Sequence, residues 1–220
     1  MSLYESPPKM QKDCSKWGEN MTLAYESGEN LYINLTNRCP NSCDFCVRTE
    51  CEKHYGDLWL EREPTAEEVI AKIKERDLSK YENLVFCGFG EPTERLAELL
   101  QIAKAVKDYR PETVIRLNTN GQANLIAGKD VTPLFEGKVD VISVSLNAPT
   151  AKAYDAICHS RFGEAAFDGL LDFAVKAKAY CKEVIFSVVD ESLSPADIEA
   201  CRKIADERGI YLRVREMIRE

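Results

Sequence analysis

Six short β-rich runs alternate with segments of helical periodicity, and this alternation limits the fold more than any other feature of the sequence. The runs span 31–36, 83–89, 113–119, 139–146, 184–189 and 210–215. Strands that alternate with helices pair in parallel through right-handed crossovers, and helices then cover the sheet. Near-continuous apolar strands are typical of such a buried parallel sheet. The sequence therefore predicts an α/β fold.

The helical segments carry recognisable start signals. Thr65 and Glu68 have the spacing of a capping box, in which each side chain accepts a hydrogen bond from the backbone of the other. Ser194 precedes Pro195, which places a capping residue before a proline at the first helical position. Besides a helix starting at Thr65, we expect helices over 93–108, 164–181 and 195–208.

Six strand–helix units are fewer than the eight that close a complete barrel. The sequence predicts a partial, open (β/α)6 TIM-like barrel with a parallel six-stranded sheet; a doubly wound sheet is the alternative. In both folds the chemistry lies at the carboxyl ends of the strands. A chain of 220 residues fits one domain. The polar residues 1–24 are expected to form a flexible leader, and 25–220 the core domain.

Charge and hydropathy exclude several classes of protein. The formal net charge of -8 argues against broad, sequence-independent nucleic-acid binding, which needs a basic surface. No apolar run reaches the roughly 18–20 residues of a membrane helix. The first residues lack the apolar centre of a secretory signal. We therefore expect a cytoplasmic protein without a membrane partner.

Three cysteines follow the first predicted strand in the spacing Cys-x3-Cys-x2-Cys: Cys39, Cys43 and Cys46. This spacing puts three thiols on one short loop, within reach of a single metal centre. Ordinary iron–sulfur carriers use four thiolates. Three thiolates on a four-iron cube leave one iron open, and an open position distinguishes a reactive metal site from a closed structural one.

A zinc site is the alternative for the same cysteines, with Cys51 as the fourth ligand. Such a protein would be a zinc-stabilised α/β binding module that recruits a partner. Zinc ribbons pair two Cys-x-x-Cys units, and this sequence has no second pair. The spacing therefore favours the iron–sulfur interpretation.

The loop resembles the signature of the radical S-adenosylmethionine (radical SAM) superfamily, with Phe45 at its aromatic position. The resemblance implies that Cys39, Cys43 and Cys46 hold a 4Fe-4S cluster whose open iron binds the amino and carboxylate groups of S-adenosyl-L-methionine. One electron then cleaves the sulfonium and yields a 5'-deoxyadenosyl radical, which abstracts a hydrogen atom from the substrate.

A glycine-containing turn follows the second predicted strand. Two glycines there let the backbone approach a ligand, and the amides of the following helix can receive a carboxylate. The turn resembles the superfamily's Gly-Gly-Glu-Pro element, which contacts the ammonium group of the cofactor. Here Phe89 stands at its second position, where the contact is made by backbone carbonyls. The cofactor-binding residues predicted in this turn are Gly88, Phe89, Gly90, Glu91 and Pro92.

Polar residues end the third and fourth predicted strands. Asn118 and Asn120 stand in an Asn-Gly turn, which is either plain turn chemistry or a holder for ribose or substrate. Ser143, Ser145 and Asn147 alternate, so they share one face of a strand. Polar groups in a buried strand need partners. In the family this strand end helps to bind the cofactor ribose and methionine carboxylate.

Charged residues offer fewer assignments. Arg161 is predicted to clamp a carboxylate of cofactor or substrate, or else to face solvent. Arg213 and Arg215 either face the barrel lumen or lie on its edge. His159 is isolated in a predicted loop. The sequence identifies no acid or base, so the catalytic residues are unassigned.

Two further motifs, over 32–43 and 59–64, are similar to those of the small radical SAM proteins associated with TatD-type hydrolases. Their substrate is unassigned. The same minimal architecture resembles glycyl-radical-activating enzymes and 7-carboxy-7-deazaguanine synthases. The resemblance implies an electron donor such as flavodoxin or ferredoxin and a substrate that is a small molecule or a protein.

Overall fold

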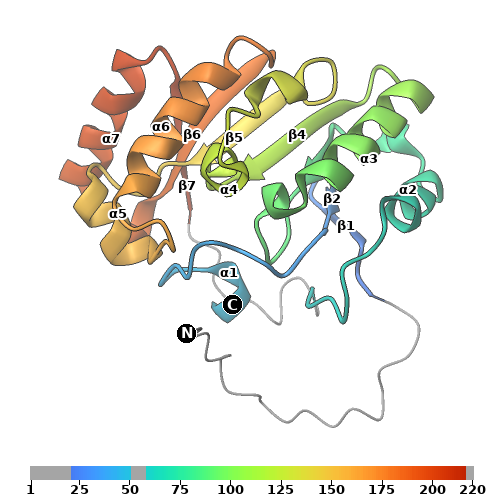
Figure 1. Cartoon of the computed structure of the whole chain (residues 1–220), viewed down its shortest axis with the longest axis horizontal. Helices are drawn as coiled ribbons and strands as arrows, with labels where there is room; N and C mark the ends of the chain where they lie inside the picture. The colour runs from blue at the N-terminus through green and yellow to red at the C-terminus, as the bar shows by residue number, and fades with distance from the viewer. Residues whose placement is uncertain (1–20, 51–57, 217–220) are drawn as a thin grey trace, which may run out of the picture.

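The computed structural model describes residues 21–50 and 58–216. Its strands form one sheet in sequence order from β1 to β7 (Figure 1). Their bounds are β1 Ala24–Ser27, β2 Asn30–Ile33, β3 Asn83–Phe86, β4 Val114–Thr119, β5 Val141–Ser145, β6 Glu183–Val189 and β7 Tyr211–Arg215. The strands β2 to β7 pair in parallel, which confirms the predicted α/β fold with a six-stranded parallel sheet.

One strand was not predicted. The strand β1 pairs antiparallel with β2, so Tyr25 lies opposite Tyr32. The two rings stack with their centroids 5.2 Å apart. In the described residues β1 and β7 are the two edges, so the sheet is open. The unbroken strand order also excludes the doubly wound alternative, in which the order reverses at the middle of the sheet.

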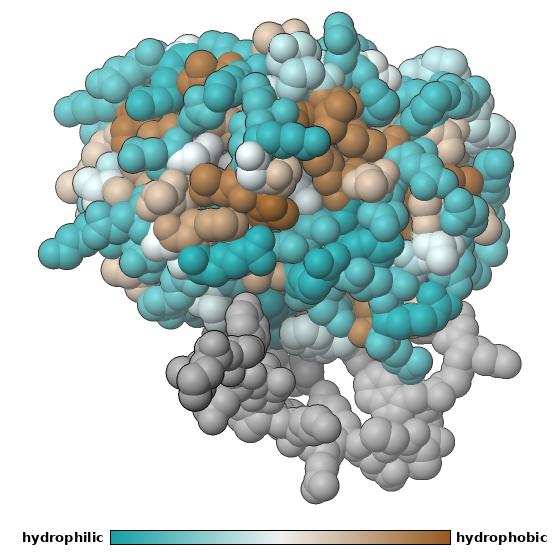
Figure 2. All heavy atoms as spheres, in the orientation of Figure 1, coloured by the Kyte–Doolittle hydropathy of each residue, from teal (hydrophilic) through white to brown (hydrophobic). Residues whose placement is uncertain are grey.

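Helices lie along one face of the sheet (Figure 1). The four longest are α2 (Ala66–Lys74), α3 (Leu96–Tyr109), α6 (Ala165–Ala177) and α7 (Pro195–Glu207); shorter ones are α1 (Val47–Glu50), α4 (Ala123–Ala127) and α5 (Ala151–Cys158). Figure 2 shows this side covered mainly by hydrophilic side chains, with hydrophobic ones in smaller patches. None of the described helices is long and apolar enough to cross a membrane.

The predicted helix starts are confirmed. Thr65 accepts a hydrogen bond from the backbone of Glu68, and the Glu68 side chain accepts one from the backbone of Thr65. Ser194 caps α7, and Pro195 is its first residue. By contrast, the helix expected from residue 93 begins as a 3-10 turn over Pro92–Arg95, and α4 and α5 were not predicted.

The strands sort their side chains between two faces. Along β4, Ile115 and Leu117 are fully buried toward the helices, whereas Arg116 and Asn118 are partly buried on the opposite face. This alternation follows from the two-residue period of a strand. The second face is the concave lumen of the partial barrel. The leader predicted over residues 1–24 falls largely outside the described residues, and the domain boundary stays a prediction.

Candidate functional site

A cavity of about 300 Å³ opens at the carboxyl ends of the parallel strands. All the predicted site residues except Arg161 line it. They come from the loop after β2 (Cys39, Cys43, Cys46), the turn after β3 (Gly88, Phe89, Gly90, Glu91, Pro92), the end of β4 (Asn118, Asn120) and the end of β5 (Ser143, Ser145, Asn147). The fold thus gathers four separate motifs into one wall.

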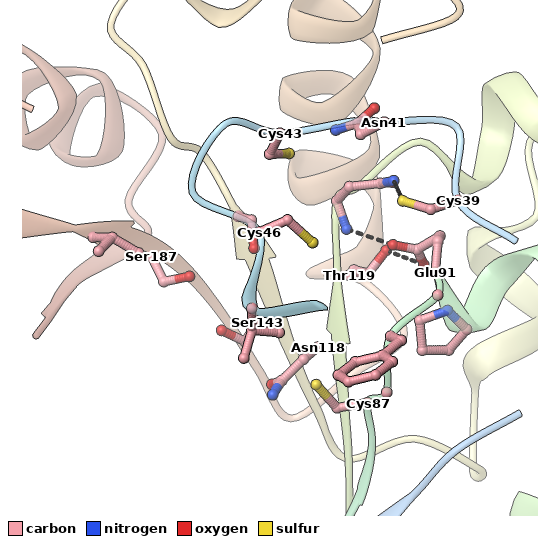
Figure 3. A pocket seen from close by; sticks show the side chains of 18 of the residues that line it. Cys39, Asn41, Cys43, Cys46, Cys87, Glu91, Asn118, Thr119, Ser143 and Ser187 are labelled. Atoms are coloured by element: carbon pink, nitrogen blue, oxygen red, sulfur yellow. Dashed lines mark hydrogen bonds between the residues drawn. The ribbon is translucent and has the colours of Figure 1, made fainter. Parts of the chain in front are cut away.

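The three cysteine side chains point toward one another across the upper part of this cavity (Figure 3). Burial raises the pKa of the Cys39 thiol to about 12, and the nearby Glu91 carboxylate adds to the rise. Burial also raises the pKa of Cys46. The pKa of Cys43 is raised chiefly by its contact with the Cys158 side chain. These three thiols are partly buried, and a cationic metal centre would stabilise their thiolates.

The backbone of the cysteine loop, residues 39–46, is docked on the end of α5. The amides of Ser42 and Asp44 donate to the carbonyl oxygens of Cys158 and Ile157, each at 3.0 Å. The amide of Arg161 donates to the Pro40 oxygen at 2.8 Å. These bonds satisfy backbone groups of both segments. They also fix the loop by a helix that lies more than a hundred residues further along the chain.

A buried polar network supports the same loop from behind. The Asn41 side chain donates to the Tyr154 hydroxyl at 3.0 Å and accepts from the Gln122 amide at 2.9 Å. Gln122 also donates to Tyr154 and accepts from the Ser160 hydroxyl, both at 3.0 Å. All four side chains are buried, so each needs these bonds. The sequence alone does not reveal this network, because single polar residues at such separations form no local pattern.

The turn after β3 needs its glycines for packing against residues 34–38, the segment that leads into the cysteine loop. A Cβ on Gly88 would collide with the Asn34 side chain, and one on Gly90 would come within 3.0 Å of the backbone oxygens of Thr36 and Arg38. Close approach of two backbones is a common reason for glycine. The sequence predicts that the glycines let the backbone approach a ligand, and in the structure they let it approach the protein's own chain.

Glu91 ties two strand ends together. Its carboxylate accepts hydrogen bonds from the backbone N–H and hydroxyl of Thr93, from the Thr119 hydroxyl and from the backbone N–H of Asn120, at 2.7–3.0 Å. Burial raises its pKa despite these four donors. The sequence predicts that the amides of the following helix receive a ligand carboxylate. In the structure, the backbone N–H of Thr93 instead donates its hydrogen bond to the carboxylate of Glu91.

Polar side chains of neighbouring strands meet in register inside the lumen. Asn118 on β4 lies opposite Ser143 on β5, and Ser145 lies opposite Ser187 on β6. Asn147 follows in the left-handed conformation, with φ of 58°. Its Oδ1 atom is buried and has no hydrogen-bond partner among the described residues. A buried acceptor of this kind fits the hydroxyl or ammonium donors of a bound cofactor.

Arg161 lies outside the cavity wall. Its guanidinium pairs with Glu94 at 3.1 Å and packs over the Phe162 ring. His159 is 2.8 Å from Asp44 of the cysteine loop, so it also belongs to the docking contact. The carboxylate clamp assigned to Arg161 stays a prediction.

The donor set fits an iron–sulfur cluster by its chemistry, since cysteine thiolates are the ligands that hold such clusters. Within residues 21–50 and 58–216, no three His, Cys, Asp or Glu side chains converge closely enough for a single metal ion. The three thiols instead border one shared space, together with an acceptor that has no protein partner. Cys51, the fourth ligand of the zinc alternative, lies outside the described residues.

The cluster-free cysteines should react slowly with alkylating reagents. Because the pKa of Cys39 is about 12 against an ordinary value of 9.0, its thiolate at neutral pH should be roughly a thousand times scarcer than that of a free thiol. We expect iodoacetamide to label Cys39 far more slowly than glutathione, with the rate rising up to strongly alkaline pH. Peptide mass spectrometry measures this, and labelling as fast as glutathione at pH 7 would contradict it.

A family model described as the radical SAM superfamily matches residues 33–204. Among curated proteins, the chain is 28% identical over 197 residues to a probable RNA methyltransferase of Sorangium cellulosum, covering 83% of this chain and 46% of that protein. It is 26% identical over 196 residues to a GTP 3',8-cyclase of Mycobacterium ulcerans, covering 87% and 51%. The chain therefore spans about half the length of these relatives.

Solved structures share the fold. SuiB of Streptococcus suis bound to its precursor peptide SuiA superposes with a TM-score of 0.63 at 15% identity, over 86% of this chain and 39% of that one. A radical SAM methyltransferase from Sphaerobacter thermophilus gives 0.57 at 17% identity, over 88% and 68%. Methylornithine synthase gives 0.59 at 16% identity, over 86% and 53%.

Proposed function

Because the chain belongs to the radical SAM superfamily, we propose that it cleaves S-adenosyl-L-methionine reductively and abstracts a hydrogen atom from a substrate. The observation that carries the proposal is the meeting of the three-cysteine loop, the turn after β3 and the polar ends of β4 and β5 around one cavity. The family implies a 4Fe-4S cluster and the cofactor. When bound, the cluster supplies the electron that cleaves the cofactor's sulfonium.

We propose that one group of cavity residues binds the cluster and another group binds the cofactor. Cys39, Cys43 and Cys46 hold the cluster at one end. The turn Gly88 to Pro92 lines the cavity, where its backbone carbonyls would accept from the cofactor's ammonium group, while Glu91 holds the turn against β4. Asn147 offers its free buried acceptor to a cofactor hydroxyl or ammonium. Ser143, Ser145, Asn118 and Asn120 supply further polar contacts.

The experiment is an assay for 5'-deoxyadenosine. The protein is purified without oxygen, reconstituted with iron and sulfide, reduced and given S-adenosyl-L-methionine. We expect brown protein with about four irons per chain, as one four-iron cluster requires, and release of 5'-deoxyadenosine. Colourless protein that holds one zinc and forms no 5'-deoxyadenosine would support the zinc-stabilised binding module and overturn the enzyme proposal.

The subfamily and the partners are also part of the proposal. The motif over 59–64 that resembles the TatD-associated proteins packs beside the site: Trp59 contacts the Phe89 ring at 5.3 Å, and the Leu60 amide donates to Asn37. We propose flavodoxin or ferredoxin as electron donor. A cytoplasmic location follows, since free thiols that hold an oxygen-sensitive cluster persist in a reducing compartment.

For the substrate, the proposal reaches only a chemical class. The relatives are named for RNA methylation and for conversion of GTP, and both of those substrates carry phosphate groups. Glycyl-radical-activating and 7-carboxy-7-deazaguanine-synthase-like activities share the minimal architecture and stay as alternatives. A product assay with candidate substrates, run after 5'-deoxyadenosine release is established, separates these activities.

A further inference from the structure

We infer that the lumen beside the cofactor site binds a substrate group with two or more negative charges, a phosphate ester or a dicarboxylate. Arg213 and Arg215 line this site and Arg116 lies next to it; we call the three the arginine cluster. The inference deepens the proposed function, since it rests on the cavity being that of a radical SAM enzyme. It assigns the substrate's chemistry without assigning its name.

Strand geometry places the three arginines together. On β7, Arg213 and Arg215 alternate with Leu212 and so share one face. Arg213 lies opposite Ser187, and Arg215 lies opposite Val189, and all four residues line the cavity. These contacts settle the question left open by the sequence: the β7 arginines face the lumen.

The third arginine, Arg116, lies beside the cavity and is not among the residues that line it. Arg116 is on β4, on the same face as Asn118, and its Nε atom donates to the Asn118 oxygen at 3.0 Å. Burial lowers the pKa of Arg116, and the charge of Arg215 lowers it further. Burial likewise lowers the pKa of Arg213, with Arg116 and Arg215 contributing. The positive charges of the neighbouring guanidinium groups therefore lower the pKa values of Arg116 and Arg213.

No ion pair joins the cluster to a carboxylate within the part of the chain that the structure describes, although the charge of Glu183 acts on Arg116. Arg116 Nη2, Arg213 Nε and Arg215 Nε are buried without a hydrogen-bond partner there. Glu216 lines the cavity, yet none of the ion pairs found among the described residues joins it to these arginines. Partly buried cations without an ion-pair partner are costly, and in a chain of net charge -8 acidic side chains are abundant. A lumen lined by Arg213 and Arg215, each with a buried nitrogen that has no partner among the described residues, is suited to an anion from outside.

The charge of the cluster exceeds what the cofactor supplies. S-adenosyl-L-methionine carries a single carboxylate, and three guanidinium groups match an anion of higher charge. Arginine also suits phosphate and carboxylate groups because its planar fork donates two parallel hydrogen bonds. Tyr25 and Tyr32, which stack on each other, line the same cavity and give the remainder of the substrate an aromatic wall.

The test measures anion binding to the full chain by calorimetry at constant ionic strength, with pyrophosphate and malonate as probes. The variant is the double substitution Arg213→Gln and Arg215→Gln. The matched control is Arg202→Gln, an arginine on α7 whose side chain is 44% exposed. We expect the double variant to bind the preferred probe at least about tenfold more weakly, through loss of bidentate contacts, and the control to bind it like the wild type.

Thermal melts give a second readout, because they measure the stability of each variant with and without a probe. Pyrophosphate or malonate should raise the Tm of the wild type and leave that of the double variant unchanged. Without a probe, the double variant should melt at the same temperature as the wild type or higher, because it has lost unpaired buried charges. A double variant that melts much lower without a probe would contradict the absence of a counterion.

The outcomes separate the sources of the anion and the two proposals. Preference for pyrophosphate indicates a phosphate ester, and preference for malonate a dicarboxylate. The inference is overturned if neither probe binds, if the double variant binds as the wild type does, or if S-adenosylhomocysteine displaces the probe. Absence of 5'-deoxyadenosine together with intact anion binding would instead overturn the radical chemistry and leave the anion site standing.

Discussion

Replacing Cys43 by alanine should leave the protein unable to retain a four-iron cluster and unable to form 5'-deoxyadenosine. Two thiolates would remain where the cube needs three, so the loss should exceed the roughly 10–100-fold cost of removing an outer-shell partner of a metal ligand. We expect the same result for Cys39→Ala and Cys46→Ala. Iron content, visible absorbance and 5'-deoxyadenosine release measure it.

Cys181→Ala is the matched control for the cysteine variants. Cys181 is partly buried near the end of α6, is absent from the cavity wall and also has its pKa raised to about 12 by burial. It therefore resembles Cys39 in chemistry but not in position. If Cys43→Ala kept its iron and its product, or if Cys181→Ala lost them, the assignment of the three ligands would be wrong.

Gly90→Ala should destabilise the fold and impair cluster loading together. The new Cβ would lie within 3.0 Å of the backbone oxygens of Thr36 and Arg38, and backbone cannot rotate away as a side chain can. The hydrogen bond from the Glu91 amide to the Arg38 oxygen, 2.8 Å long, would be strained by the same shift. We expect a loss of about 2–3 kcal/mol in the free energy of unfolding, typical of overpacking, measured by urea denaturation.

Gly169→Ala provides the comparison within the same chain. There the added Cβ meets the Leu125 side chain, which can move, and the substitution in α6 gains helix propensity of about 1 kcal/mol. We expect little change in stability and normal iron content. Equal effects of the two substitutions would show that contact with the backbone of Thr36 and Arg38 is not what makes Gly90 necessary.

Most of the fold could be predicted from patterns of residues that are close in sequence. The β-rich runs predicted β2 to β7, and the capping signals at Thr65 and Ser194 placed two helix starts, because both features depend on residues close in sequence. The strand β1 was missed because its four residues show almost no alternation between buried and exposed positions. The helix α5 was missed for a similar reason: it has only eight residues.

The site divides in the same way. Motifs that stand on single loops, such as the three cysteines, could be found from spacing alone. Contacts that join distant segments could not: the Asn41–Tyr154 hydrogen bond spans 113 residues, and Gln122 joins the same network from a third segment. The direction of Arg213 depended on which face of β7 turns into the lumen, and alternation alone leaves that choice open. Only the assembled sheet decides it.

The docking of the cysteine loop on α5 also sets an order of events during biosynthesis. The loop emerges from the ribosome early, but the carbonyl oxygens of Ile157 and Cys158 that hold its amides are made more than a hundred residues later. Until then the ligands sit on an unsupported segment. A nascent chain that ends before α5 therefore lacks the surface that shapes the metal site, and cluster delivery is best timed after the second half of the barrel has been synthesised.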